Sequence, residues 1–382
     1  MIIALVAGES SGDKLGAALI EAIQTRHPDA RFVGIGGPMM SAAGMDIWWD
    51  IEQLSVMGLF EIIQHVPRLL SMRQQLITRL IELGPAVFVG IDAPDFNLGI
   101  ERKLKARAIP VIHYVSPTVW AWRPGRVKTI ARATDHVLCL FPFEPICYQQ
   151  QNVSALYTGH PLADEIPLNV DVISARKALG INNTGPCIAL LPGSRMSEVQ
   201  KLTVPMLDAA VLLTEKYPGI RFLIPAVTEL IRNRLIAEKN SYQGINCMVL
   251  SASGTDVIAA SDVVICASGT ATLEVMLINR PMVVCYRLSG MTYYLAKWFK
   301  LVKSRFISLP NILASEPLVP ELLQHEVKGQ TIAKSVSQWL EKPEACDTLK
   351  RRFDLLHAEL KVAAAKTAAN VVLQHISNRR AD

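Results

Sequence analysis

The chain has 382 residues, half of them hydrophobic and 19% charged, and a formal net charge of +5. This composition is that of a globular protein rather than a disordered one, and the length predicts two domains. Basic residues form no long run, which argues against nucleic acid as a partner. The seven cysteines form no CxxC pair, which argues against zinc and indicates reduced thiols in a cytoplasmic protein.

Short apolar runs alternate with helical patterns along the whole chain, which is typical of α/β domains with parallel sheets wound from βαβ units. In the first half, strands are predicted near 2–7, 31–36, 86–91, 110–115, 136–141 and 155–158. In the second half they are predicted near 187–191, 221–226, 246–250, 263–267 and 282–286. The fold class expected is therefore a pair of doubly wound, Rossmann-like domains.

The proline-rich segment His160–Asn169 separates the two sets of strands and is interpreted as a hinge. We expect a first domain over 1–165, a second over 170–345 and a C-terminal segment over 346–382. That segment contains one long helical pattern, about 345–378, which either returns to the first domain or reaches a partner subunit. No stretch approaches the roughly 20 apolar residues that a membrane-spanning helix needs.

Two acidic residues follow predicted strands of the first half. Glu9 lies in the turn Gly8–Asp13 and is placed to face a ligand, although Ser10 or Ser11 in that turn is equally explained as a helix cap. Asp92 ends the strand near 86–91, where a partly buried carboxylate with a raised pKa can accept a proton from a hydroxyl. Asp92 is favoured over Asp95, which a loop or helix start also explains, and Asn97 is expected to cap the next helix.

Aromatic residues follow the strand near 110–115. Trp120 and Trp122 precede Arg123 there and can line a sugar or acyl surface, or fill the core instead. His113 is interpreted as a strand histidine with a satisfied ring and not as a catalyst.

In the second half, two apolar strands each run into a turn of small residues and then a helix, at Cys187–Arg195 and Val263–Glu274. Free N–H groups at a helix start bind anionic oxygens, and Arg195 adds a charged fork suited to a diphosphate. Glu274 can accept hydrogen bonds from paired sugar hydroxyls. The two turns together suggest a nucleotide-sugar pocket, although such turns are also common without a ligand.

Two further segments, 57–83 and 293–303, mix apolar or aromatic residues with basic ones. Basic amphipathic helices of this kind lie in a membrane surface, but helices buried in a large domain look similar. The sequence contains no HExxH motif and no pair of aspartates separated by one residue. We therefore expect no metal and no other cofactor, and we expect loop N–H groups and Arg195 to meet the charge of a departing diphosphate.

Six segments in this order resemble the family of lipid-A-disaccharide synthases. They are Gly8–Asp13, Gly90–Asn97, Ser116–Arg123, Leu191–Arg195, Ala267–Glu274 and Ser308–Leu313. The resemblance implies a GT-B glycosyltransferase of lipid A biosynthesis in Gram-negative bacteria, with two domains facing a central cleft. It implies an inverting, metal-independent transfer of 2,3-diacylglucosamine from UDP to the 6-hydroxyl of 2,3-diacylglucosamine 1-phosphate. The product is the β-1,6 disaccharide 1-phosphate, made at the cytoplasmic face of the inner membrane, and a homodimer is one expected state.

The resemblance also implies roles for individual residues. Asp92 corresponds to the general base, and Glu9 and Asn311 fall at positions linked to activity, Glu9 on the catalytic side and Asn311 on the acceptor or phosphate side. The implied UDP-binding residues are Gly193, Ser194, Arg195, Ser268, Gly269, Thr270 and Glu274. The implied membrane contacts are Phe60, Ile62, Ile63, Val66, Leu69 and Leu70.

Two other functions remain open from the sequence. A UDP-sugar epimerase or hydrolase has the same architecture but acts on water-soluble sugars and has no use for the apolar segment at 57–83. A two-lobed solute-binding protein closes on its ligand without chemistry, but such proteins are usually exported, and the start of the chain lacks the basic region of a signal peptide.

Overall fold

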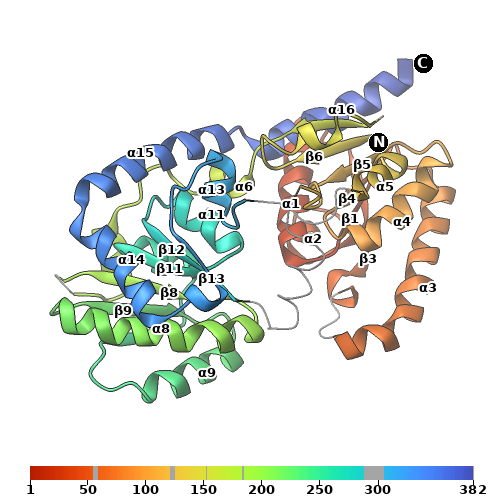
Figure 1. Cartoon of the computed structure of the whole chain (residues 1–382). Coiled ribbons are helices and arrows are strands. Elements are labelled where there is room, and N and C mark those ends of the chain that lie inside the picture. Colours follow the sequence, from red (N-terminus) through yellow and green to blue (C-terminus); the bar gives the residue numbers. More distant parts are fainter. Residues whose placement is uncertain (55–58, 121–124, 152, 183–184, 288–304, 382) are drawn as a thin grey trace. The chain divides into compact units, whose positions relative to one another are not determined.

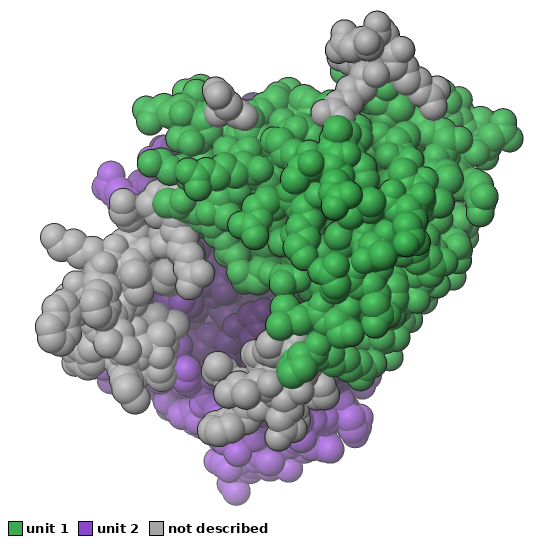
Figure 2. Space-filling view, turned by 90° about the vertical axis from the view of Figure 1, so that its right-hand side faces the viewer, with its two compact units in different colours: residues 1–164, 360–382 green, residues 165–359 purple. Residues whose placement is uncertain are grey.

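The structure is a computed structural model of the whole chain. It describes every residue except 55–58, 121–124, 152, 183–184, 288–304 and 382, and for 59–66 and 378–381 it describes the backbone alone. The chain divides into two compact units, Met1–Asp164 with Leu360–Asp382, and Glu165–Glu359 (Figure 2). The boundary between Asp164 and Glu165 falls inside the segment interpreted as a hinge, where a short helix, α6 (Pro161–Glu165), has formed.

Unit 1 is built on a parallel sheet of seven strands in the order β3-β2-β1-β4-β5-β6-β7 (Figure 1). The strands are β1 (Ile2–Ala7), β2 (Arg31–Gly36), β3 (Asp46–Asp50), β4 (Val87–Ile91), β5 (Val111–Tyr114), β6 (His136–Cys139) and β7 (Ser154–Tyr157). All the strands predicted for the first half are confirmed. The edge strand β3 was not predicted, because its sequence Asp-Ile-Trp-Trp-Asp has no continuous apolar run and begins and ends on aspartate.

The helices of unit 1 bury an apolar face against this sheet. They are α1 (Ser10–Gln24), α2 (Pro38–Ala42), α3 (Leu59–Leu83), α4 (Pro94–Lys105) and α5 (Arg126–Ala133), with α16 (Ala364–Ala381) from the end of the chain. β1 and β4 lie at the centre of the sheet and are fully buried beyond Ile2. Such strands need apolar residues at every position, because helices cover both faces of the sheet.

The C-terminal segment is two helices, so the expectation of a single one was wrong. α15 (Pro343–Leu360) belongs to unit 2 except for its last residue, and α16 packs on α1 of unit 1. The break falls at Ala363, whose φ of 56° is left-handed. The carboxylate of Asp164 accepts hydrogen bonds from the N–H groups of Ala363 (3.0 Å) and Ala364 (2.6 Å), and so caps the start of α16.

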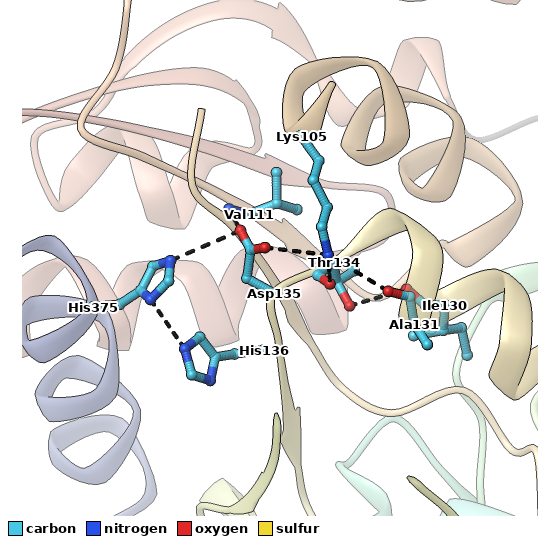
Figure 3. A network of polar contacts seen from close by, with 8 residues as sticks. All are labelled: Lys105, Val111, Ile130, Ala131, Thr134, Asp135, His136 and His375. Carbon is cyan, nitrogen blue, oxygen red and sulfur yellow. Dashed lines mark hydrogen bonds and ion pairs between the residues drawn. The ribbon is translucent and has the colours of Figure 1, made fainter. Parts of the chain in front are cut away.

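A polar network attaches α16 to the sheet of unit 1 (Figure 3). Nδ1 of His375 lies 3.0 Å from Nε2 of His136, the first residue of β6. Nε2 of His375 lies 3.8 Å from the carboxylate of Asp135, which also pairs with Nζ of Lys105 at 3.2 Å. Burial lowers the pKa of His136, so its ring is held neutral against α16.

Unit 2 is built on a second parallel sheet, in the order β10-β9-β8-β11-β12-β13. Its strands are β8 (Cys187–Leu191), β9 (Arg221–Pro225), β10 (Cys247–Leu250), β11 (Val263–Ala267), β12 (Met282–Tyr286) and β13 (Glu321–Leu323). All the predicted strands are confirmed, and the three-residue β13 was too short to predict. In both units the first strand lies inside the sheet and the order reverses there, which makes both doubly wound.

The helices of unit 2 are α7 (Val172–Ala178), α8 (Met196–Lys216), α9 (Glu229–Asn240), α10 (Gly254–Ala259), α11 (Thr270–Leu277), α13 (Leu309–Ala314) and α14 (Gly329–Glu341), with most of α15. α8 and α14 contact each other and share an apolar core with β8 and β11.

The segment expected at a membrane surface is only partly described. Phe60, Ile62, Ile63 and Val66 have side chains outside the described residues, as does the whole segment 293–303. Leu70 is 48% exposed, whereas Leu69 packs against the core of unit 1. The later part of α3 is a core helix, with Met72, Leu76, Ile77 and Leu80 buried. Among the described residues, no helix has both the length and the apolarity needed to cross a bilayer.

Candidate functional site

In unit 1 the candidate site lies where the adjacent strands β1 and β4 end. Glu9 follows β1 and Asp92 follows β4, and the two strands pair in register from Ile3↔Val87 to Ala7↔Ile91. A Cβ on Gly8 would overlap the Cβ of Ala93, so only glycine lets the two loops approach this closely. The topology therefore brings Glu9 and Asp92 to the same edge of the sheet, with Glu9 exposed and Asp92 half-buried.

The turn that carries Asp92 has an unusual backbone. Asp92 and Ala93 have φ of 51° and 41°, both left-handed although neither is glycine. The Nδ2 group of the buried Asn97 donates to the carbonyl oxygens of Asp92 (2.8 Å) and Val6 (3.3 Å) and thereby fixes the turn. Strained turns of this kind persist where the surroundings determine them, commonly at functional sites.

The cap expected of Asn97 was wrong, and the alternative of a cap by Ser10 or Ser11 is not observed either. Ala93 is the residue before α4, and Asn97 lies inside that helix and bonds back to the turn instead of capping it. Glu9 is the residue before α1, which begins at Ser10, and no side chain caps that helix start. Asp13 of the same turn has a structural role, because its buried carboxylate accepts N–H groups from Gly37, Met39 and Met40 at 2.7–3.1 Å.

A cavity of about 480 Å³ adjoins the Asp92 turn. Its lining is Asp92, Pro94, Val115–Val119, Arg126, Leu140, Phe141 and Glu144. Asp95 is not part of this lining. Its largely exposed carboxylate pairs with the guanidinium of Arg126, which does line the cavity. Burial raises the pKa of Glu144 to about 7, so that this carboxyl group is half protonated at neutral pH.

His113 of β5 is a buried strand histidine, as predicted, but its ring is only half satisfied, because Nε2 is buried without a hydrogen-bond partner among the described residues. Its Nδ1 lies 2.6 Å from Oε1 of Glu101, and both side chains are fully buried. Burial raises the pKa of Glu101, and the nearby imidazole opposes that shift. Trp120 packs edge-on against Phe143, with ring centroids 5.2 Å apart, while Trp122 and Arg123 lie outside the described residues.

In unit 2 the two small-residue turns lie side by side, because β8 and β11 are adjacent strands with Leu191 opposite Cys266. They line one pocket of about 410 Å³. Its lining includes Gly193, Ser194, Arg195, Ser268, Gly269, Thr270 and Glu274. The structure thus brings together all seven residues implied to bind UDP, at the starts of α8 and α11. Two helix starts with their N–H groups on one pocket suit an anionic ligand.

Arg195 is the cationic side chain that lines this pocket. Arg195 precedes α8 with its side chain 78% exposed, so the guanidinium is available to a ligand. Among the described residues, its guanidinium pairs with the carboxylate of Glu198, at 3.4 Å. A Cβ on Gly193, which has φ of 120°, would overlap Glu198, so glycine is required there on two counts.

Asn311 is not at the surface of either pocket. It is 1% exposed, and its amide bonds to the backbone of Val319 and to Oε1 of Glu321, each at 2.9 Å. The carboxylate of Glu321 also accepts the N–H and hydroxyl groups of Ser308. The carbonyl of Ile307 in this turn accepts the hydroxyl of Ser268, at 3.0 Å. Asn311 therefore supports the turn that holds Ser268, and its contact with a ligand remains a prediction.

The sequence analysis did not single out Arg126, Glu144 or Glu321. Arg126 and Glu144 line the cavity beside Asp92, and Glu321 supports the loop that carries Ser268. None of the three follows the carboxyl end of a predicted strand directly, so strand-end position gave no signal for them. An acid just before a proline, Glu144-Pro145, was the one local hint of a turn at that place.

Two doubly wound units of this kind define the GT-B fold. Solved structures with this fold include MurG of Acinetobacter baumannii (TM-score 0.57, 12% identity, 98% of this chain and 99% of that one). UDP-GlcNAc 2-epimerase of Neisseria meningitidis bound to UDP-GlcNAc is also similar (TM-score 0.61, 12% identity, 99% and 100%). At these identities the likeness concerns the fold alone.

The family model described as lipid-A-disaccharide synthetase matches residues 3–373. A lipid-A-disaccharide synthase of Erwinia tasmaniensis is 47% identical over 375 residues, 98% of each chain. Another from Alcanivorax borkumensis is 44% identical over 371 residues, 97% of this chain and 96% of that one. The chain belongs to the lipid-A-disaccharide synthetase family.

Proposed function

We propose that the protein transfers 2,3-diacylglucosamine from UDP to the 6-hydroxyl of 2,3-diacylglucosamine 1-phosphate. The products are the β-1,6 disaccharide 1-phosphate and UDP. Membership of the family over nearly the whole chain supports this reaction. The observation that carries it is the pocket of unit 2, where the turns after β8 and β11 place Arg195, Glu274 and two helix starts around one space. This set suits the phosphates and ribose of a UDP-sugar.

The proposed chemistry is a single displacement with inversion. The carboxylate of Asp92 takes the proton of the 6-hydroxyl while that oxygen attacks the anomeric carbon and the bond to the diphosphate breaks. The electron pair of that bond leaves with UDP, whose added charge is met by Arg195 and by N–H groups at the starts of α8 and α11. These groups stabilise the charge of the leaving diphosphate, as a metal ion does in other transferases. We therefore propose that the transfer step uses no metal ion.

The identity of Asp92 as the base rests on its place in unit 1. It ends a central strand, lines a cavity and is held by a turn that Asn97 fixes from within the fold. Asp95 has a different environment, because it is paired with Arg126 and its side chain is 87% exposed. Glu9, on the neighbouring strand end, is available as a second acidic group on the acceptor side.

We also propose that unit 1 meets the inner face of the inner membrane through the start of α3, since both substrates carry acyl chains. The exposed Leu70 supports this contact, whereas Leu69 is partly buried and packs against the core of unit 1. A homodimer that exchanges C-terminal parts would place α16 of one chain on α1 of the other. The mass in solution distinguishes this dimer from a chain whose α16 packs on its own α1.

Incubation with the two acylated substrates, followed by mass spectrometry of the lipid product, tests the proposed reaction. The expected products are a disaccharide 1-phosphate and an equivalent of UDP. Incubation with UDP-N-acetylglucosamine and no lipid acceptor tests the epimerase or hydrolase alternative. The family match does not favour that alternative, and turnover of the soluble sugar without disaccharide from the lipids would overturn our proposal.

A further inference from the structure

We propose that Arg126 binds the phosphate group of the acceptor, in the same cavity of unit 1 where Asp92 meets the acceptor hydroxyl. This inference rests on the proposed function, because it takes the acceptor to be a sugar 1-phosphate. It adds a phosphate-binding residue to the acceptor side of the proposed reaction.

The composition of the cavity carries the inference. Arg126 is the one cationic side chain among the described residues that line it, and Asp92 lies in the same lining. The acceptor carries its 1-phosphate on C1 and its 6-hydroxyl on the carbon attached to C5, and C1 and C5 are the two carbons that flank the ring oxygen. A volume of about 480 Å³ is within the usual range for small-ligand sites, so the cavity that Asp92 and Arg126 both line has room for a sugar ring.

The bonding of Arg126 leaves it free to exchange partners. Its guanidinium pairs with the carboxylate of Asp95, whose side chain is 87% exposed while that of Arg126 is 21% exposed. Exposed carboxylates contribute little to such pairs, since water screens the charge. A phosphate can replace Asp95 and take two hydrogen bonds from the planar guanidinium, with more charge than the carboxylate has.

Two carboxyl groups share the cavity with Arg126, namely Asp92, which the proposed reaction places at the 6-hydroxyl of the acceptor, and Glu144. Glu144 is 3% exposed, and burial raises its pKa to about 7, so it is largely uncharged under mildly acidic conditions. Its Oε2 accepts the N–H of Phe141 at 3.0 Å, which keeps the group in the wall of the cavity. The remaining lining between Val115 and Val119 is uncharged.

The test pairs a change in the protein with a change in the acceptor. Wild type and Arg126→Gln are assayed with 2,3-diacylglucosamine 1-phosphate and with the same lipid lacking the phosphate. Loss of a charge-assisted contact predicts a fall in kcat/KM of about 10- to 100-fold with the phosphorylated acceptor, mainly through KM. With the unphosphorylated acceptor, wild type and variant are expected to be nearly equal.

An equal loss on both acceptors, or no loss on the phosphorylated one, would overturn the inference. If wild type forms no disaccharide from either acceptor, the proposed function itself has failed. Arg132→Gln is the matched control, because Arg132 is an exposed arginine of the same helix and does not line this cavity. It is expected to leave both acceptors unaffected.

A second variant covers the case in which Arg126→Gln does not fold. Asp95→Asn removes the carboxylate that competes with the phosphate for Arg126. It is expected to lower KM for the phosphorylated acceptor and to leave KM for the unphosphorylated one unchanged. A KM for the phosphorylated acceptor that stays the same or rises would count against Arg126.

Discussion

Acid should destabilise unit 1 through one buried histidine, His160. It is 9% exposed, its Nδ1 accepts the N–H of Leu162 at 3.2 Å, and its ring lies 5.5 Å from that of Phe141. Burial lowers its pKa from 6.5 to about 4. Between pH 4 and pH 6.5 the native state therefore binds fewer protons than the unfolded chain. The contribution of His160 to the free energy of unfolding is complete above pH 6.5 and is lost as the pH falls toward 4.

The size of this effect follows from the difference of about 2.5 between the two pKa values. At about 1.4 kcal/mol for each unit, the free energy of unfolding falls by about 3 kcal/mol between pH 7 and pH 4. The matched variant is His160→Asn, which keeps an acceptor for the N–H of Leu162 but does not titrate.

The assay is urea unfolding at several pH values, followed by tryptophan fluorescence, for wild type and for His160→Asn. We expect the wild-type free energy to fall more steeply than that of the variant, with the two curves separating by about 3 kcal/mol over this range. All other titrating groups are common to both proteins and cancel in the difference. Parallel curves would refute the reasoning about His160.

Two further predictions concern ligands and membranes. Arg195→Ala should weaken UDP binding about tenfold, measured by calorimetry, because an exposed charge-assisted contact is lost. The control Arg234→Ala on α9 should leave UDP binding unchanged. Equal affinity of Arg195→Ala and wild type for UDP would remove Arg195 from the site. Replacing Phe60, Ile63 and Leu70 with serine should move the protein from sedimented lipid vesicles to the supernatant, while its circular dichroism spectrum stays unchanged. The control Leu83→Ser, at an exposed position at the other end of α3, should leave the protein with the vesicles. Unaltered sedimentation of the triple variant would place the membrane contact elsewhere.

The alternation of apolar runs and helices predicted most of the fold, because strands buried on both faces need continuous apolar sequence. β3 and β13 escaped prediction for opposite reasons. β3 lies at a sheet edge and carries tryptophans between aspartates, and β13 is only three residues long. The break before α16 depends on Asp164, about 200 residues away in the chain, so no local pattern could reveal it.

In the candidate sites, too, positions set by local sequence could be predicted and positions set by distant contacts could not. Residues at the carboxyl ends of strands, such as Asp92 and Arg195, could be predicted, because parallel strands place their following loops at one edge of a sheet. Asn97, Arg126 and Glu321 could not, because each acts through a contact with a residue distant in sequence or through a cavity formed by several loops. Asn311 illustrates the limit, since the resemblance indicates a functional position while the structure buries its amide.

The central claim is that Asp92 accepts the proton of the acceptor hydroxyl, and the turnover of Asp92→Asn tests it most directly. The amide keeps the shape of the side chain but is not a base, so we expect kcat to fall by about 100- to 10,000-fold while calorimetry shows unchanged UDP binding. Turnover within a few fold of wild type, with the same disaccharide product, would contradict the account.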